Sequence, residues 1–109
     1  MGAIDSWRAQ QIMETVLVRV ADDKAQVLIV DIAGVPVVDT KVADHLVKTT
    51  AAVRLLGAQT ILTGISPQVA RTVVQLGVDI TTMHTKSRLA DGIELALSIC
   101  GKTIKNKES

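Results

Sequence analysis

The stretch from Val27 to Val42, VLIVDIAGVPVVDTKV, constrains the fold of this 109-residue chain more than any other. Its first four residues form an unbroken apolar run of high β propensity, too short for a helix. Such a run is typical of a strand covered on both faces, as in a parallel sheet. A Gly/Pro turn at residues 34–36 then ends the strand. Apolar residues recur at helical spacing after Asp39, a good N-cap residue that leaves Thr40 in the first helical turn. The stretch predicts a buried strand, a turn and the start of a long helix.

The rest of the chain alternates between helical and strand patterns. Ser66-Pro67 joins a preferred N-cap residue to a proline tolerated at the first helical position, which predicts a sharp helix start. We expect helices at about 6–21, 40–56, 67–76 and 86–100, strands at about 27–33, 60–64 and 78–82, and a polar tail at 102–109. Strands joined through helices should be parallel, with the helices packed on the sheet. The predicted class is α/β, in one domain over residues 1–101 that opens on a helix, as if its first strand or strands were missing.

Composition excludes several classes of function. Although 48% of the residues are hydrophobic, Phe and Tyr are absent and Trp7 is the only aromatic residue. The core should therefore be aliphatic, and stacking surfaces for single-stranded nucleic acid are not expected. The net charge is +1 with no run of Lys or Arg, so we expect no nucleic-acid partner. No apolar run reaches the roughly 18 residues of a membrane span, and a single cysteine, Cys100, suits a reducing cytosol.

Two hydroxyls are the strongest candidates for a functional site. In a parallel sheet, the turns from strands into helices all lie at the carboxyl edge. Thr40 follows the first strand and Ser66 follows the second, so both should lie on one edge, each at a helix N-terminus. A phosphate group on either would be partly stabilised by the helix dipole, whereas Asp39 would oppose one on Thr40. The alternative is that both residues merely cap their helices, because Ser and Thr are common there.

Other chemistry finds little support in the pattern. His45, His84 and Cys100 lack metal-ligand spacing, and the two histidines are better interpreted as surface or hydrogen-bonded side chains. Asp31 and Asp39 share no helical register, which favours structural roles over a catalytic pair. The phosphate-loop, dinucleotide-binding and nucleophile-elbow motifs are absent from the sequence. We therefore expect no catalytic residue, no metal site and no cofactor.

Three segments carry a resemblance to a known family. GAIDSWRAQQIMETVL, VLIVDIAGVPVVDTKVADHL and AVRLLGAQTILTGISPQVARTVVQLGVDI resemble the C-terminal STAS domain of stressosome scaffold proteins of the RsbR type. The likeness covers about residues 2–100, and its specific motifs are D-T at one strand-to-helix turn and G-I-S-P at the next. It implies a mixed, mostly parallel sheet with helices packed on it, in a protein that binds partner proteins and is not an enzyme. The family's domain begins with one or two strands before GAIDS, and its full-length members add a sensor domain.

The resemblance also implies a site and partners. The family's two phospho-acceptors fall on Thr40 and Ser66, and the residues beside them that would contact a partner are Asp39, Lys41 and Pro67. The partners would be a serine/threonine switch kinase, a smaller STAS-only paralogue and further copies of the domain, in a large cytoplasmic cage that holds the kinase until stress releases it. Two other functions stay open: a free anti-sigma-factor antagonist, and a small-ligand binding protein that uses the crevice at the carboxyl edge of the sheet.

Overall fold

The computed structural model describes residues 6–35, 39–75 and 83–108. The elements, in chain order, are α1 (Ser6–Asp23), β1 (Val27–Asp31), α2 (Thr40–Leu55), β2 (Gln59–Thr63), α3 (Pro67–Gln75), β3 (His84–Lys86) and α4 (Leu89–Glu108). Helices and strands therefore alternate, as the hydrophobic pattern predicts. None of the helices in these ranges has an apolar stretch long enough to cross a bilayer.

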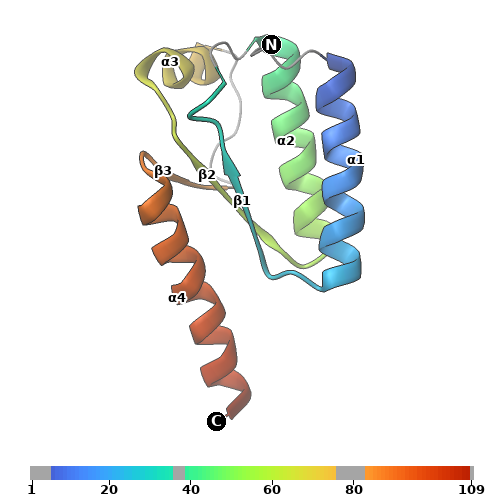
Figure 1. Ribbon diagram of the computed structural model, residues 1–109, viewed down its shortest axis with the longest axis vertical. Coiled ribbons are helices and arrows are strands. Elements are labelled where there is room, and N and C mark those ends of the chain that lie inside the picture. Colours follow the sequence, from blue (N-terminus) through green and yellow to red (C-terminus); the bar gives the residue numbers. More distant parts are fainter. Residues whose placement is uncertain (1–5, 36–38, 76–82, 109) are drawn as a thin grey trace.

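The described strands form a parallel sheet in the order β1-β2-β3. Val27 lies opposite Gln59 and Asp31 lies opposite Thr63, so β1 and β2 end together. The backbone N–H of Ile32 extends the pairing by one hydrogen bond of 3.0 Å to the carbonyl of Thr63. Because the strands end level with each other, the segments that follow them leave the sheet from one edge (Figure 1).

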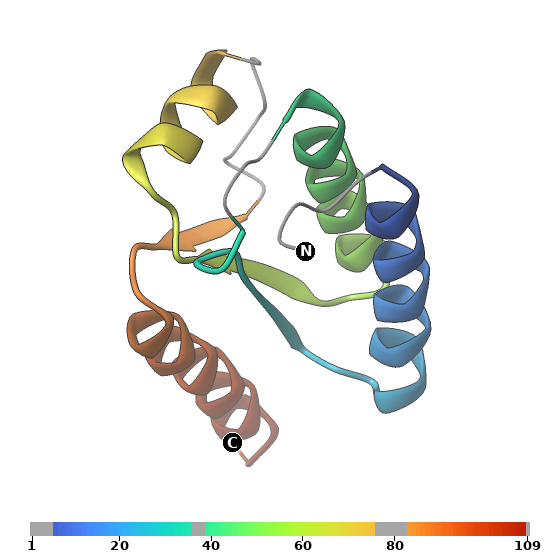
Figure 2. The ribbon, with the colours of Figure 1, turned by 45° about the horizontal axis from the view of Figure 1, so that its top comes forward.

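The helices cover the two faces of the sheet unequally. Helices α1 and α2 pack against each other on one face, and α2 also contacts β2. Helix α4 lies on the opposite face and packs against all three strands (Figure 2). Helix α3 lies beyond the carboxyl ends of the strands, near the beginning of α2 (Figure 1). The sheet is thus the middle of three layers, with two helices above it and one below.

The core is built from aliphatic side chains and falls into two clusters. The first lies near the carboxyl edge and joins the sheet to α2 and α3, with Ile32, Val42, Ala43, Leu62 and Val69 buried. The second lies where α1 meets the end of α2, with Val20, Val53 and Ala58 buried. The buried residues of both clusters, as far as the structure describes them, are aliphatic, in agreement with the expectation drawn from composition. Burial of these branched side chains supplies the main favourable term in folding.

The last third of the chain departs most from the sequence prediction. The strand expected at 78–82 lies outside the described residues. The structure has β3 at His84–Lys86, where we expected a loop and the first residue of the last helix. Helix α4 begins at Leu89 and continues to Glu108, so the predicted helix end at Gly101 is wrong. A glycine inside a helix costs about 1 kcal/mol, which the surrounding turns can offset. The first strand also ends at Asp31 because the chain turns there, with Val35 N–H bonded to the carbonyl of Ile32 at 3.0 Å.

Gly64, directly after β2, occupies a position that no other residue fits. Its φ angle is 74°, in the left-handed region that favours glycine. A Cβ atom there would lie 2.5 Å from Asp31 Oδ1 and 2.6 Å from the backbone nitrogen of Ala33. The chain after β2 therefore passes directly against the turn after β1. Gly57, with φ of 89°, has the same backbone conformation, but a Cβ atom at that position would meet no other atom within 4 Å.

These two glycines allow backbone strain and steric overlap to be separated. We expect Gly57→Ala to lower the free energy of unfolding by about 1 kcal/mol, because only its backbone conformation is strained. Gly64→Ala should lower it by roughly 2–4 kcal/mol, because overlap with Asp31 and Ala33 adds to the same strain. Urea denaturation followed by circular dichroism measures both values. Equal losses for the two variants would contradict the close approach at Gly64.

Candidate functional site

The candidate site lies where α2 and α3 begin, beside the carboxyl ends of β1 and β2 (Figure 1). We call this surface the rim and define it by Thr40 and Ser66 with their neighbours Asp39, Lys41 and Pro67. All five residues are exposed. The structure thus brings the two predicted hydroxyls to one edge of the sheet and leaves both open to solvent, as the sequence pattern predicts.

At the start of α2, the capping group and the candidate acceptor are separate residues. Asp39 has an extended backbone, and its carboxylate accepts a hydrogen bond of 2.9 Å from the backbone N–H of Val42. Thr40 is the first residue of the helix, and its hydroxyl forms no hydrogen bond to any residue that the structure describes. The cap satisfies one of the unpaired N–H groups of the first turn. The Thr40 hydroxyl is therefore free to be modified without loss of the cap.

At the start of α3, one residue is both the helix cap and the candidate acceptor. Ser66 Oγ accepts a hydrogen bond of 3.2 Å from the backbone N–H of Val69, and its carbonyl accepts one of 2.9 Å from the N–H of Ala70. Pro67 follows as the first helical residue, where a missing N–H has no cost. The side chain of Ser66 is exposed although its oxygen caps the helix. The capping interpretation is thus confirmed for Ser66 and for Asp39, whereas Thr40 has no capping bond.

A side-chain contact that sequence reasoning missed ties the two strand ends together. The hydroxyl of Thr63, a fully buried residue, donates a hydrogen bond of 3.1 Å to Asp31 Oδ1. The same carboxylate oxygen accepts a longer bond of 3.4 Å from the backbone N–H of Ala33. These bonds give Asp31 a structural role, which is the role that the sequence favoured. The only sequence signal for the contact is that each residue ends its strand.

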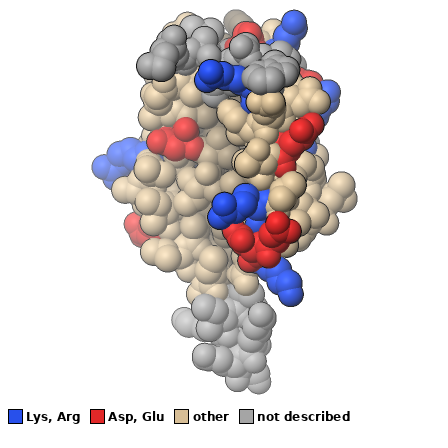
Figure 3. Space-filling view, turned by 45° about the vertical axis from the view of Figure 1, so that its right-hand side comes forward, with Lys and Arg blue, Asp and Glu red and all other residues tan. Residues whose placement is uncertain are grey.

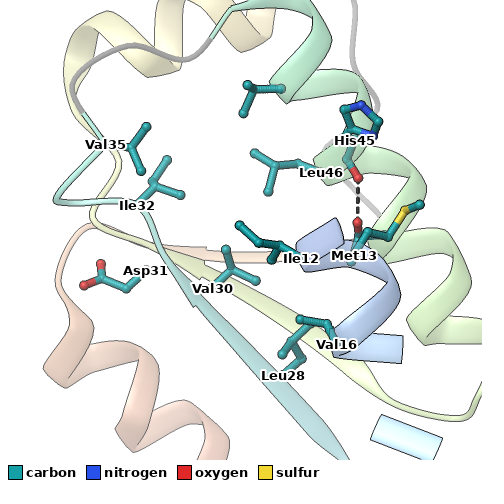
Figure 4. A pocket seen from close by; sticks show the side chains of 12 residues that line it. Ile12, Met13, Val16, Leu28, Val30, Asp31, Ile32, Val35, His45 and Leu46 are labelled. Carbon is teal, nitrogen blue, oxygen red and sulfur yellow. Dashed lines mark hydrogen bonds between the residues drawn. The ribbon is translucent and has the colours of Figure 1, made fainter. Parts of the chain in front are cut away.

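An apolar groove lies beside the rim, between α1, α2 and β1 (Figure 4). Its volume is about 260 Å³. Aliphatic side chains from all three elements line it, among them Ile12, Val16, Leu28, Val30 and Leu46. In Figure 4 the Asp31 carboxylate points away from this group of side chains. The groove is thus lined mainly by apolar side chains. Two titratable residues, Asp31 and His45, also line it, and they come from different elements.

Comparison with known proteins decides the family. A model of the STAS domain matches residues 1–92. The chain belongs to the STAS family. Its two strand-to-helix turns, with D-T at Thr40 and G-I-S-P at Ser66, therefore lie on a STAS fold.

Curated relatives of this STAS domain come from Bacillus subtilis (strain 168). The RsbT co-antagonist protein RsbRA is 46% identical over 104 residues, which are 95% of this chain and 38% of that protein. The RsbT co-antagonist protein RsbRD is 43% identical over 85% of this chain and 34% of its own length. The uncharacterized protein YezB is 42% identical over 75% of this chain and 84% of its own length. The chain thus spans about a third of the co-antagonist proteins and most of YezB.

Solved structures agree on the fold. RsbS of Moorella thermoacetica superposes with a TM-score of 0.80 at 28% identity, covering 92% of this chain and 86% of the other. A chain from a structure of the stressosome, described as a signal integration and transduction hub, superposes with a TM-score of 0.76 at 29% identity, covering 91% and 90%. The predicted STAS-like fold is therefore confirmed.

The remaining candidate residues of this STAS domain form no site for a metal. Among the residues that the structure describes, no group of three His, Cys, Asp or Glu side chains is placed to hold an ion. His84 Nε2 lies 2.8 Å from Gln59 Oε1, which confirms a hydrogen-bonded histidine on the surface. Cys100 is a free, half-buried cysteine of α4. Positive and negative side chains are interspersed on the face shown in Figure 3, where they form no single-sign surface.

The geometry of the two helix starts leads to a prediction on stability. We expect Ser66→Ala to lower the free energy of unfolding by about 1 kcal/mol, because the N–H of Val69 loses its acceptor. Thr40→Ala should change the same quantity by less than about 0.5 kcal/mol, because its hydroxyl accepts no helix N–H. Denaturant titration of the two purified variants measures both changes. The opposite order would show that Thr40, and not Ser66, carries the capping bond.

Proposed function

We propose that this STAS domain is a phosphorylation-controlled scaffold of the stressosome, which sequesters and releases a serine/threonine switch kinase in general stress signalling. The observation that carries the proposal is the rim: Thr40 and Ser66 are both exposed, and each lies at a capped helix start on the same edge of the sheet. The 46% identity to an RsbT co-antagonist protein over 95% of the chain supports it.

Electrostatics explains how modification would act at the rim. A phosphate group adds nearly two negative charges at neutral pH and brings three strong acceptor oxygens. Both sites lie at the positive end of a helix dipole, which favours added negative charge by some tenths of a kcal/mol to about 1 kcal/mol. Asp39 opposes a phosphate on Thr40, whereas Lys41 is a nearby cation. The fold therefore tolerates the phosphate, and a docked partner meets a changed surface.

The partners follow from the relatives. The names of RsbRA and RsbRD identify them as RsbT co-antagonists, and one structural neighbour is a stressosome chain. We propose that the rim contacts the kinase through Asp39, Lys41 and Pro67 beside the two acceptors. Self-association and assembly with a STAS-only paralogue, such as the RsbS neighbour, would build the cage. The reducing cytosol inferred from composition is its expected location.

Two alternatives differ from this proposal in ways that can be measured. A free anti-sigma-factor antagonist would act through the first motif alone, and the second motif at Ser66-Pro67 favours the scaffold. A small-ligand binding protein would use a crevice of the domain, and a thermal-shift screen with nucleotides and common metabolites tests it. We propose a non-enzymatic role because the rim offers hydroxyls at helix starts with no neighbouring base among the described contacts.

The first prediction of the proposal concerns covalent modification. We expect a cognate switch kinase with ATP to phosphorylate Thr40 and Ser66, because both hydroxyls are exposed at the rim. Intact mass should rise by two phosphates, and peptide mass spectrometry should place them on these residues. Thr40→Ala and Ser66→Ala should each lose one phosphate, and the double variant should lose both. An unmodified protein in the presence of kinase that remains active on another substrate would contradict the proposal.

The second prediction concerns capture of the kinase. We expect Thr40→Asp to weaken kinase binding by at least about fivefold, because a fixed negative charge beside Asp39 changes the docking surface. Ser98→Asp is the matched control, since Ser98 is exposed on α4, on the opposite face of the sheet. A quantitative pull-down or surface plasmon resonance compares the two. Equal affinities for Thr40→Asp and the unmodified domain would remove the rim from kinase docking.

A further inference from the structure

A second cavity lies at the amino edge of the sheet, between the C-terminal part of α2 and the beginnings of β2 and β3. Its volume is about 230 Å³, and Arg54, Thr60 and Met83 are among its lining residues. Thr40 begins α2 and Arg54 lies in its last turn, so roughly 21 Å of helix separate them at about 1.5 Å per residue (Figure 1). We call this site the amino-edge cavity; it is remote from the rim.

Thr60 presents a buried hydroxyl to the amino-edge cavity. Its neighbour Ile61 faces α4, because a Cβ atom on Gly92 of that helix would lie 3.4 Å from Ile61 Cγ2. Side chains alternate along a strand, so Thr60 faces α2. Thr60 is 4% exposed, and its hydroxyl has no hydrogen-bond partner among the residues that the structure describes. A buried hydroxyl without a partner is costly and uncommon, which points to a partner from outside the chain.

Arg54 supplies the charge of the cavity. It is an exposed residue in the last turn of α2, where the helix dipole favours a cation. Its guanidinium forms no ion pair with any residue in the described part of the chain. The described residues that line the cavity include no carboxylate that could neutralise it. The amino-edge cavity therefore joins an uncompensated cation to an unpartnered hydroxyl.

We propose that the amino-edge cavity binds a small organic carboxylate. The planar guanidinium of Arg54 matches a carboxylate through two parallel hydrogen bonds, and the Thr60 hydroxyl donates a third. Ala58, which is buried, and Met83, which is half-buried, offer apolar contacts to a short aliphatic part of the ligand. The ligand thus gives the Thr60 hydroxyl the acceptor that the described chain does not provide.

The other hydroxyl of the lining is already engaged. Thr50 Oγ1 donates a hydrogen bond of 2.9 Å to the backbone carbonyl of Leu46, one turn earlier in α2. This bond uses the single proton of the Thr50 hydroxyl. Thr60 is therefore the threonine of the cavity that has a donor to offer, and the test below is built on it.

The surroundings favour a carboxylate over a phosphate group. The C-terminal end of a helix carries partial negative charge, which opposes a dianion more than a monoanion. Phosphate is commonly held at the opposite end of a helix, by its free N–H groups, whereas this cavity lies beside the last turn of α2. The cavity is also smaller than the roughly 300–1,000 Å³ of ordinary ligand pockets, which suits a molecule of a few carbon atoms.

The inference goes beyond the proposed function, because it adds a ligand at the edge of the sheet opposite the rim. Titration of the ¹⁵N-labelled domain with sodium butyrate or sodium succinate, followed by heteronuclear NMR, tests it. We expect saturable shifts of the backbone amides of Arg54, Thr60 and Met83. Butyramide, which has the shape of butyrate without its charge, should bind at least about tenfold more weakly. Sodium chloride at equal ionic strength controls for the effect of salt.

Two variants assign the contacts. Arg54→Gln should weaken carboxylate binding at least about tenfold, because the anion loses its cation. Arg71→Gln is the matched control, since Arg71 is an exposed arginine of α3. Thr60→Val should weaken binding at least about threefold. It should leave the thermal midpoint of the free domain unchanged or raised, because no hydrogen bond is lost.

Several results would overturn the proposal. These are the absence of saturable shifts up to about 50 mM of either carboxylate, equal binding of butyramide, or unchanged affinity in Arg54→Gln. A lowered midpoint for Thr60→Val would show that its hydroxyl holds the fold together, and binding of inorganic phosphate without binding of the carboxylates would exclude the ligand class. The titration contains no kinase and no ATP, so its failure would leave the proposed control of the rim unaffected.

Discussion

The level pairing of β1 with β2 is the constraint on which the rim depends. Asp31 and Thr63 are opposite each other in the parallel register and also share a side-chain hydrogen bond of 3.1 Å. Gly64 then allows the chain after β2 to pass against the turn after β1. Because both strands end at one level, the helices that follow begin on one edge. A shift of this register would move the starts of α2 and α3 to different levels and so separate Thr40 from Ser66.

The hydroxyls of the rim lie outside the buried clusters that stabilise the fold. The buried clusters are aliphatic, and the two candidate hydroxyls are exposed outside them. A helix cap contributes about 1 kcal/mol, a modest fraction of the roughly 5–15 kcal/mol that stabilise an ordinary domain. A covalent charge at such a position can therefore change the surface that a partner meets while the core stays as it was. This separation suits the proposed control of the rim by phosphorylation.

Local patterns in the sequence were sufficient for the first two thirds of the fold. The VLIV run, the Asp39 cap and the Ser66-Pro67 start each act within a few residues, so their effect can be derived from neighbours alone. The later elements depend on partners that are distant in the chain. β3 at His84–Lys86 has a fully exposed pattern and is defined by its pairing with β2, and α4 continues through Gly101 against local preference.

The same limit applies to the site. The positions of Thr40 and Ser66 followed from the general geometry of parallel sheets, and the structure places both on the expected edge. The contact between Asp31 and Thr63 joins residues 32 positions apart, and no spacing rule connects them. The close approach at Gly64 depends on the same tertiary placement. The sequence therefore did not predict the hydrogen bond and the close backbone approach that join the ends of β1 and β2.

Gly92 lets α4 approach the end of β2 closely. Its missing side chain lets the helix press on Thr63 near its first turn, and Thr63 in turn holds Asp31 at the end of β1. Sixteen residues follow Gly92 in the helix, a length of roughly 24 Å at 1.5 Å per residue. A tilt of α4 by about 10° around Gly92 would move the C-terminal end of the helix by roughly 4 Å. The end of β1, the end of β2 and the beginning of α4 are thus joined by direct contacts through Thr63.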